Sequence, residues 1–132
     1  MVDLTEYEKA MEVLNNLAKD YEVWVQSDLQ NLKNAYIKAQ QTQKEKRLDV
    51  MMNEVFKIAH DMKGQGATFG YDLVTDIGNH LCRYIEKQPC FDEEQMEAVE
   101  KHIQAISEIL NTHLTGDGGV RGNELKTMIE AL

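Results

Sequence analysis

The first 63 residues of this 132-residue chain contain neither glycine nor proline. Both residues interrupt helices. A stretch of this length that lacks them and is rich in Glu, Lys, Gln, Leu, Met and Ala therefore predicts α-helix. The single proline, Pro89, falls in an expected short connection. No run alternates apolar and polar residues for long enough to indicate a strand. These absences predict an all-α protein.

Positive charge and cysteine are also scarce. The formal net charge of -9 argues against nucleic acid or an anionic membrane as a partner. Cys82 and Cys90 match no zinc or redox spacing and are expected to be reduced thiols. The first residues lack the basic and apolar regions of a signal peptide, and no apolar run approaches membrane-spanning length. We therefore expect a cytoplasmic protein whose partners are proteins or small molecules.

A long apolar stripe marks the N-terminal third of the chain. It steps by threes and fours through Tyr7, Met11, Leu14, Ala18, Tyr21, Val25, Leu32, Tyr36 and Ala39. The continuous phase allows one helix over residues 5–42. However, Asn15, Asn16 and Asp20 favour caps and turns, so we expect a break between residues 15 and 20. We also expect Trp24, with Tyr21 and Tyr36, at the core or its boundary.

The second helix is expected to begin at a capping box formed by Thr42 and Glu45. It would run to about Thr68, and Gly70 would end it by allowing the chain to turn. Lys44, Lys46 and Arg47, close to its start, are expected to form a solvated charge run. The following helix is expected over residues 71–86.

Asp92 and Gln95 form a second capping pattern, which opens a helix whose apolar stripe ends at Leu110. A glycine-rich linker is expected over 115–122, followed by a short helix over 123–132 capped by Asn123. The expected architecture is an antiparallel four-helix bundle with an additional N-terminal helix or helix extension. We expect one domain over 1–132 with its core at about 20–114. Residues 7–39 could alternatively form a coiled-coil surface, which leaves open whether the protein is a monomer or a dimer.

At 100° per residue, His60 points away from the apolar side of its helix. The apolar side carries Met51, Val55, Ile58, Met62 and Phe69. The residues in line with His60 are Asn53, Phe56, Lys57, Lys63, Gly64 and Ala67. A structural histidine normally sits on or beside the apolar side, so the position of His60 indicates a function.

The neighbours of His60 favour phosphoryl chemistry. A neutral imidazole is a good nucleophile near pH 7. Lys63, one turn on, can reach a group attached to the ring, and Lys57 is a second cation one turn back. Gly64 costs about 1 kcal/mol in a helix interior, which close approach of another surface to His60 would explain. Together these residues predict a phosphoryl acceptor.

The run His60-Asp61-Met62-Lys63-Gly64, followed by Gly70, resembles the H-x-x-K-G-x-x-x-x-x-G signature of histidine-containing phosphotransfer (HPt) domains. The resemblance implies a four-helix bundle in which His60 carries the phosphoryl group. It also implies that Lys63 steadies the phosphate, Gly64 clears room for the docking partner and Gly70 turns the chain. Gln65 and Gly66 depart from the small residues, mostly Ser or Ala, that are usual there. Gly66 is expected to be harmless, whereas Gln65 is bulky enough to affect local packing or docking.

By the same resemblance, His60 takes phosphate from an aspartyl phosphate on a response-regulator receiver domain and passes it to another receiver. A hybrid sensor histidine kinase is the implied source, and Mg²⁺ is expected on the receiver, with no intrinsic cofactor on this chain. Asn53, Phe56, Lys57 and Ala67 are candidate docking residues.

The chain is expected to be a phosphoryl carrier and not an enzyme. Its segment GQGATFG lacks the lysine placement of an ATP-binding P-loop and follows a helix instead of a strand. His80, His102 and His113 are expected on flanks or at the surface, without a metal site. The alternative is a helical module that binds a kinase or receiver without carrying phosphate.

Overall fold

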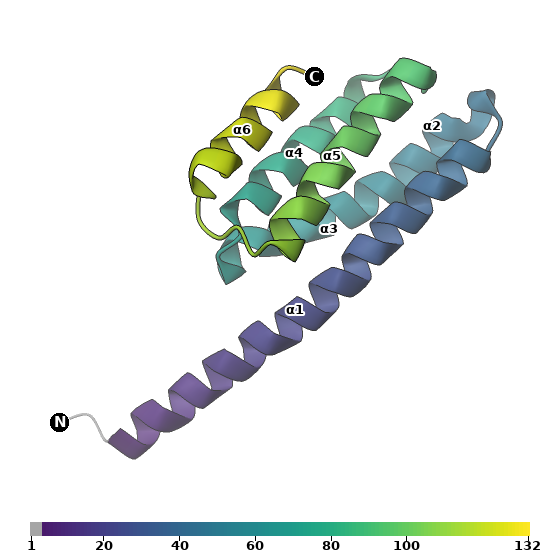
Figure 1. Cartoon of the computed structure of the whole chain (residues 1–132). Coiled ribbons are helices and arrows are strands. Elements are labelled where there is room, and N and C mark those ends of the chain that lie inside the picture. Colours follow the sequence, from purple (N-terminus) through teal and green to yellow (C-terminus); the bar gives the residue numbers. More distant parts are fainter. Residues whose placement is uncertain (1–3) are drawn as a thin grey trace.

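The computed structural model describes residues 4–132, with side chains from Thr5 onward. All its regular elements are helices (Figure 1). Four of them form an antiparallel bundle: the C-terminal half of α1 (Leu4–Gln41), the continuous segment that ends in α3 (Phe56–Gly66), then α4 (Asp72–Lys87) and α5 (Glu93–Asn111). A shorter helix, α6, packs against α4 and α5. No helix of the described chain combines the length and hydrophobicity that crossing a bilayer requires. The expected all-α four-helix bundle is confirmed.

Helix α1 runs without interruption over Leu4–Gln41, so the expected break between residues 15 and 20 is wrong. Asn15, Asn16 and Asp20 are all exposed, where their low helix propensity costs only a few tenths of a kcal/mol each. The second half of α1 buries Tyr21 and Tyr36 in the core, whereas the first half extends beyond the bundle (Figure 1). Trp24 is 52% exposed and is not a core residue.

The second segment does not begin at a capping box. The Thr42 hydroxyl donates to the carbonyl of Lys38 and so belongs to the end of α1. A 3₁₀ turn, η1 (Lys44–Lys46), leads into α2 (Arg47–Val50). Arg47 is not a solvated charge. Its guanidinium donates to the carbonyls of Ala39, Gln40 and Thr42, at the C-terminal end of α1 where helical N–H partners run out, and to the carbonyl of Phe91 in the connection before α5.

The helix then continues through a π-turn, η2 (Met51–Val55), into α3 (Phe56–Gly66) and a 3₁₀ turn, η3 (Ala67–Phe69). Gly70 follows with a φ of +89°, in the left-handed region that favours glycine. The Tyr71 N–H donates to the carbonyl of Gly66 across this turn. The expected role of Gly70 in ending the helix is confirmed.

Helices α4 (Asp72–Lys87) and α5 (Glu93–Asn111) lie close to their expected positions. The capping box of Asp92 and Gln95 is present, with both reciprocal hydrogen bonds. Each helix turns an apolar stripe inward, because its large aliphatic residues recur at helical spacing. The buried residues of these two stripes include Leu73, Ile77, Leu81, Ile85, Val99, Ile103, Ile106 and Leu110.

Helix α6 begins earlier than expected, at Gly119, and ends at Glu130. Its N-cap is Gly118, in the left-handed region, and not Asn123. The Asp117 carboxylate accepts a hydrogen bond from the Gly119 N–H. Gly122 is buried, and a Cβ there would lie within 3 Å of the Asp117 backbone, so the tight turn needs a glycine at this position.

Candidate functional site

His60 lies in the middle of α3 and is exposed, as the helical phase predicts. On the opposite side of the same helix, Ala59 and Met62 are buried in the core. The residues expected in line with His60 do share its open side. Asn53, Lys57, Gly64 and Ala67 are exposed, and Phe56 and Lys63 are half-buried. The structure therefore brings the predicted site residues onto one face.

The Phe56 ring lies beside the His60 imidazole, with ring centroids 6.0 Å apart and planes inclined by 23°. Phe56 also packs partly against the core, which holds its ring in place. Phe56, Lys57, His60 and Asp61 line a shallow open hollow. The imidazole is thus presented on a surface and not inside a cleft, which suits contact with another protein more than capture of a small molecule.

Lys63 is positioned by a residue that the sequence did not single out. Its ammonium donates a hydrogen bond to the side-chain carbonyl of Asn79 on α4, at 3.1 Å. Asn79 is half-buried and follows Gly78 in α4. That polar residue beside a glycine was a detectable signal. Its pairing with Lys63 depended on the register of α3 against α4, which a single sequence does not supply.

The glycines near the site have two different roles. A Cβ added at Gly64 would meet no atom within 4 Å. A Cβ at Gly78 would lie 2.9 Å from the Cβ of Lys63, and one at Gly66 would lie 2.9 Å from the carbonyl oxygen of Tyr71. Gly66 and Gly78 therefore let α3 and α4 approach closely, so glycine at position 66 is not only tolerated, as expected, but needed for this packing. Nothing within the described chain requires a glycine at position 64.

Thr75 of α4 fixes the C-terminal end of α3 below the site. Its hydroxyl donates to the carbonyl of Lys63 at 2.8 Å and accepts from the Ala67 N–H at 2.9 Å. Lys63 lies in the last turn of α3, where carbonyls lack helical partners, and Ala67 begins η3. The hydroxyl therefore anchors the backbone of the turn that carries Lys63 and Gly64. Gln65, the bulky departure from the expected motif, is exposed and takes no part in this contact.

Charges of both signs surround the exposed face. Lys57 and Lys63 supply the cations, and Asp61 follows His60 directly in the sequence. Burial, and after it the negative charge of Asp61, raises the pKa of the Asp28 carboxyl on α1. Burial also raises the pKa of the Cys82 thiol, which keeps it protonated and unreactive near neutral pH.

Of the remaining histidines, His113 is exposed and His80 is half-buried, as expected, but His102 does not lie on a flank or at the surface. His102 is fully buried, and its Nε2 lies 2.8 Å from Nδ1 of the half-buried His80. The Nδ1 of His102 lies 2.6 Å from the carbonyl oxygen of Ala98. Burial lowers the pKa of His102 to about 4. Within the described residues, no three histidine, cysteine or carboxylate side chains form a group that could hold a metal ion.

The fold and the site define a class of protein: an antiparallel helical bundle that presents the imidazole of His60 on an open face in the middle of α3. The family model described as Hpt domain matches residues 16–132, nearly the whole chain, and the chain belongs to this family. Hpt domains are phosphocarrier modules and not classical enzymes, and they interact with receiver domains and histidine kinases. Membership supports a histidine phosphotransfer role in phosphorelay signalling. No match was found among curated proteins or among solved structures.

Proposed function

We propose that His60 accepts a phosphoryl group from the aspartyl phosphate of a receiver domain and passes it to a second receiver. The observation that carries this proposal is the exposure of His60 in the middle of α3, above a core-facing side that is fully packed. The Hpt family match supports the chemistry, and the His60, Lys63 and Gly64 spacing assigns it to this histidine.

In the proposed step, the unprotonated ring nitrogen of His60 attacks the phosphorus of the acyl phosphate in line with the bond that breaks. A P–N bond forms, the P–O bond to the aspartate breaks, and the carboxylate leaves with the electron pair. The other ring nitrogen keeps its proton. Attack on the phosphohistidine by the aspartate of the second receiver reverses these changes. The divalent cation that assists the transfer is expected on the receiver, so this chain contributes position and charge.

Lys63 would neutralise part of the charge that the phosphoryl group brings. Its ammonium already has a fixed acceptor in Asn79, so Asn79 would act as a positioning residue by holding Lys63 near the helix surface. Gly64 would leave room for the receiver backbone or side chains beside His60. Phe56, half-buried next to the imidazole, would offer the receiver an apolar contact, with Asn53, Lys57 and Ala67 around it.

The test is phosphate transfer from labelled phospho-receiver domains to the wild-type protein and to His60→Gln. We expect an acid-labile, base-stable adduct on the wild type and none on the variant. Loss of one charge-assisted hydrogen bond costs about 1.5–3 kcal/mol, so Lys63→Gln should slow transfer roughly tenfold to a hundredfold. Asn79→Ala should slow it less, and Lys87→Gln, which removes an exposed positive charge at the end of α4, serves as the control for loss of charge outside the proposed docking face.

If a broad panel of receivers binds the protein but labels neither form, the carrier proposal fails. The protein would then be a module that binds receivers and does not carry a phosphoryl group. Label that persists on His60→Gln would instead assign the chemistry to another residue.

A further inference from the structure

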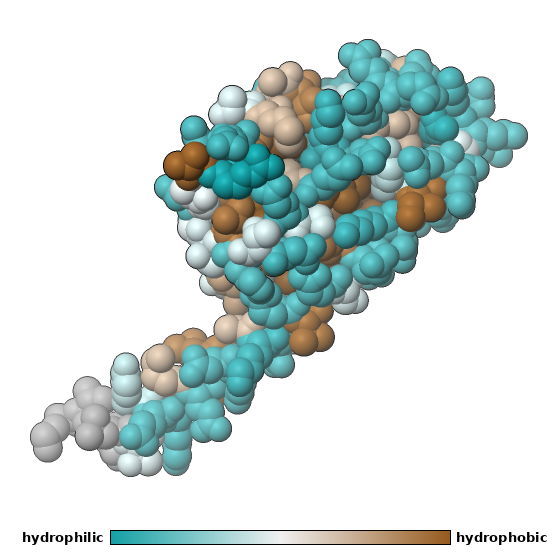
Figure 2. Space-filling view, viewed as in Figure 1, coloured by the Kyte–Doolittle hydropathy of each residue, from teal (hydrophilic) through white to brown (hydrophobic). Residues whose placement is uncertain are grey.

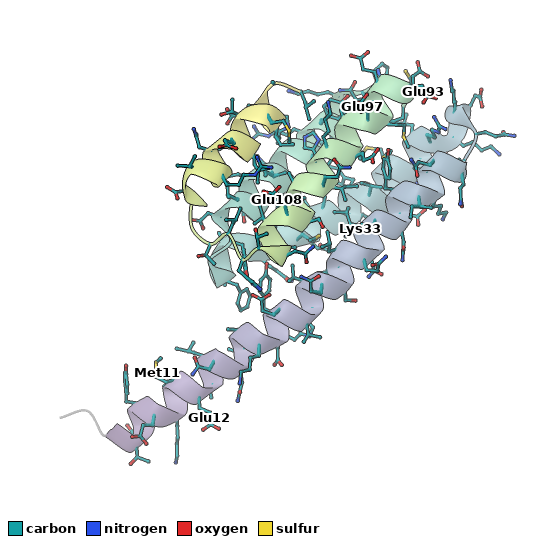
Figure 3. The ribbon with its side chains drawn as sticks, in the orientation of Figure 1. Met11, Glu12, Lys33, Glu93, Glu97 and Glu108 are labelled. Carbon is teal, nitrogen blue, oxygen red and sulfur yellow. The ribbon has the colours of Figure 1, made fainter. Side chains whose placement is uncertain are left out.

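The N-terminal part of α1 forms an arm, defined here as residues 5–20, in which every side chain is exposed. Along one edge it carries Tyr7, Met11 and Leu14, which are 56%, 39% and 56% exposed, followed by Ala18. Figure 2 shows apolar side chains gathered along the upper edge of the arm. In Figure 3, Met11 projects from that edge and Glu12 from the opposite one. The Hpt family match begins only at residue 16, so most of the arm lies outside the family unit.

A helix of this length has little stability by itself in water, because helices in proteins are held mainly by packing of an amphipathic face. The exposed residues Tyr7, Met11, Leu14 and Ala18 are spaced by four, three and four. This is the seam of a coiled coil, in which each apolar side chain packs against the facing helix. An exposed apolar seam of this kind marks an interaction surface.

We propose that the arm pairs with the arm of a second copy of this chain in an antiparallel two-stranded coiled coil. In this arrangement Met11 packs against Leu14 of the second copy, and Tyr7 against Ala18. The inference rests on the arm alone and does not depend on the proposed function of His60.

The antiparallel direction of the pairing follows from the position of the bundle relative to the arm. On α1, the exposed seam continues in phase into the buried residues Tyr21 and Val25, so the arm presents the same face that the bundle covers further along. A parallel partner helix would follow that face toward the C-terminus and run into the bundle. An antiparallel partner reaches the bundle only with its N-terminal end, so the whole arm stays available for pairing.

The antiparallel register also matches sizes and charges. The large Tyr7 faces the small Ala18 at both ends of the interface, and Met11 faces Leu14 at its centre. On the flanks, Leu17 meets Ala10 of the second copy, and Glu8 meets Asn15, so like charges are not opposed.

Long-range electrostatics favours the same arrangement. Each chain carries a formal net charge of -9. The arm is 16 residues long and spans about 24 Å, which is well over the screening length of roughly 8 Å at physiological ionic strength. An antiparallel pairing holds the two bundles at opposite ends of the arms, whereas a parallel pairing would bring them together.

The first experiment measures molar mass by sedimentation equilibrium across a concentration series. We expect the full chain to give twice its 15.2 kDa and the double variant Met11→Glu/Leu14→Glu to give one chain mass. Val23→Glu is the matched control, because Val23 is 69% exposed and lies on another face of α1; it should stay dimeric. A monomeric wild type up to about 100 μM would overturn the proposal, as would a dimer that the double variant leaves intact.

The second experiment tests the direction by disulfide cross-linking in a Cys90→Ser background, because Cys90 is exposed whereas Cys82 is buried. Antiparallel pairing predicts a cross-link when Tyr7→Cys and Ala18→Cys proteins are mixed. Neither protein should cross-link with itself, since like positions would lie about 16 Å apart along the helix axes. Self-cross-linking of both single variants, without the mixed product, would show a parallel pair and overturn the antiparallel arrangement.

Discussion

Replacing Gly64 by alanine should make the bundle more stable and the phosphotransfer worse. Gly64 is helical and exposed, and an added Cβ meets nothing within 4 Å. Glycine in a helix costs about 0.5–1 kcal/mol relative to alanine, so Gly64→Ala should raise the free energy of unfolding by about that amount. If a receiver packs against this position, the new methyl group overpacks the interface. That would cost about 1–3 kcal/mol, or roughly fivefold to 150-fold in receiver affinity.

Urea unfolding and transfer from a phospho-receiver, measured on the same preparations, test both halves of this prediction. Gly66→Ala is the matched control two residues away. Its Cβ would lie 2.8 Å from the Thr75 hydroxyl and 2.9 Å from the Tyr71 carbonyl oxygen, so it should destabilise the bundle by about 1–3 kcal/mol. A Gly64→Ala protein that is less stable, or that transfers phosphate at the wild-type rate, would refute the reasoning about the space beside His60.

Two further predictions concern stability. The pKa of His102 is lowered to about 4 by burial, so between about pH 6.5 and 4 the unfolded chain binds a proton that the folded chain does not. The free energy of unfolding should therefore fall as the pH falls through this window, by up to about 3 kcal/mol, and His102→Leu should flatten the slope in urea titrations at several pH values. Arg47→Met removes the guanidinium from four backbone carbonyls and should lower the free energy of unfolding by about 2–3 kcal/mol. Lys46→Met, which removes the neighbouring exposed charge, should change it by less than about 0.5 kcal/mol in the same assay; equal effects would show that Arg47 acts through charge alone.

The features that were predicted correctly from the sequence depend on apolar periodicity or on short capping and turn motifs. The outward position of His60, the turn at Gly70 and the capping box at Asp92 all follow from local patterns, and all are present. One local pattern gave a wrong prediction. The polar residues near Asn15 suggested a break, but the helix tolerates them on an exposed face, and the apolar phase that runs through them was the better guide.

Contacts between helices were beyond prediction. Lys63 meets Asn79, and Gly66 meets Thr75, only because α3 and α4 pack in one particular register. Buried His102 did leave a signal, since it lies between Val99 and Ile103 on the apolar side of its helix. That position is where a structural histidine is expected, and it should have separated His102 from the surface histidines.

The π-turn η2 sets the rotation, about the helix axis, of α3 relative to α2 within one continuous helical segment. The Phe56 N–H donates to the carbonyl of Met51, five residues back, so the turn holds one residue more than α-helical spacing allows. One residue corresponds to about 100° of rotation around the axis. Deleting a single residue there would restore uniform α-helical spacing and rotate one part of the segment relative to the other. Either Arg47 would then lose its hydrogen bonds to the α1 carbonyls, or His60 would turn away from its open face. The length of this short stretch is therefore constrained by the contacts at both of its ends.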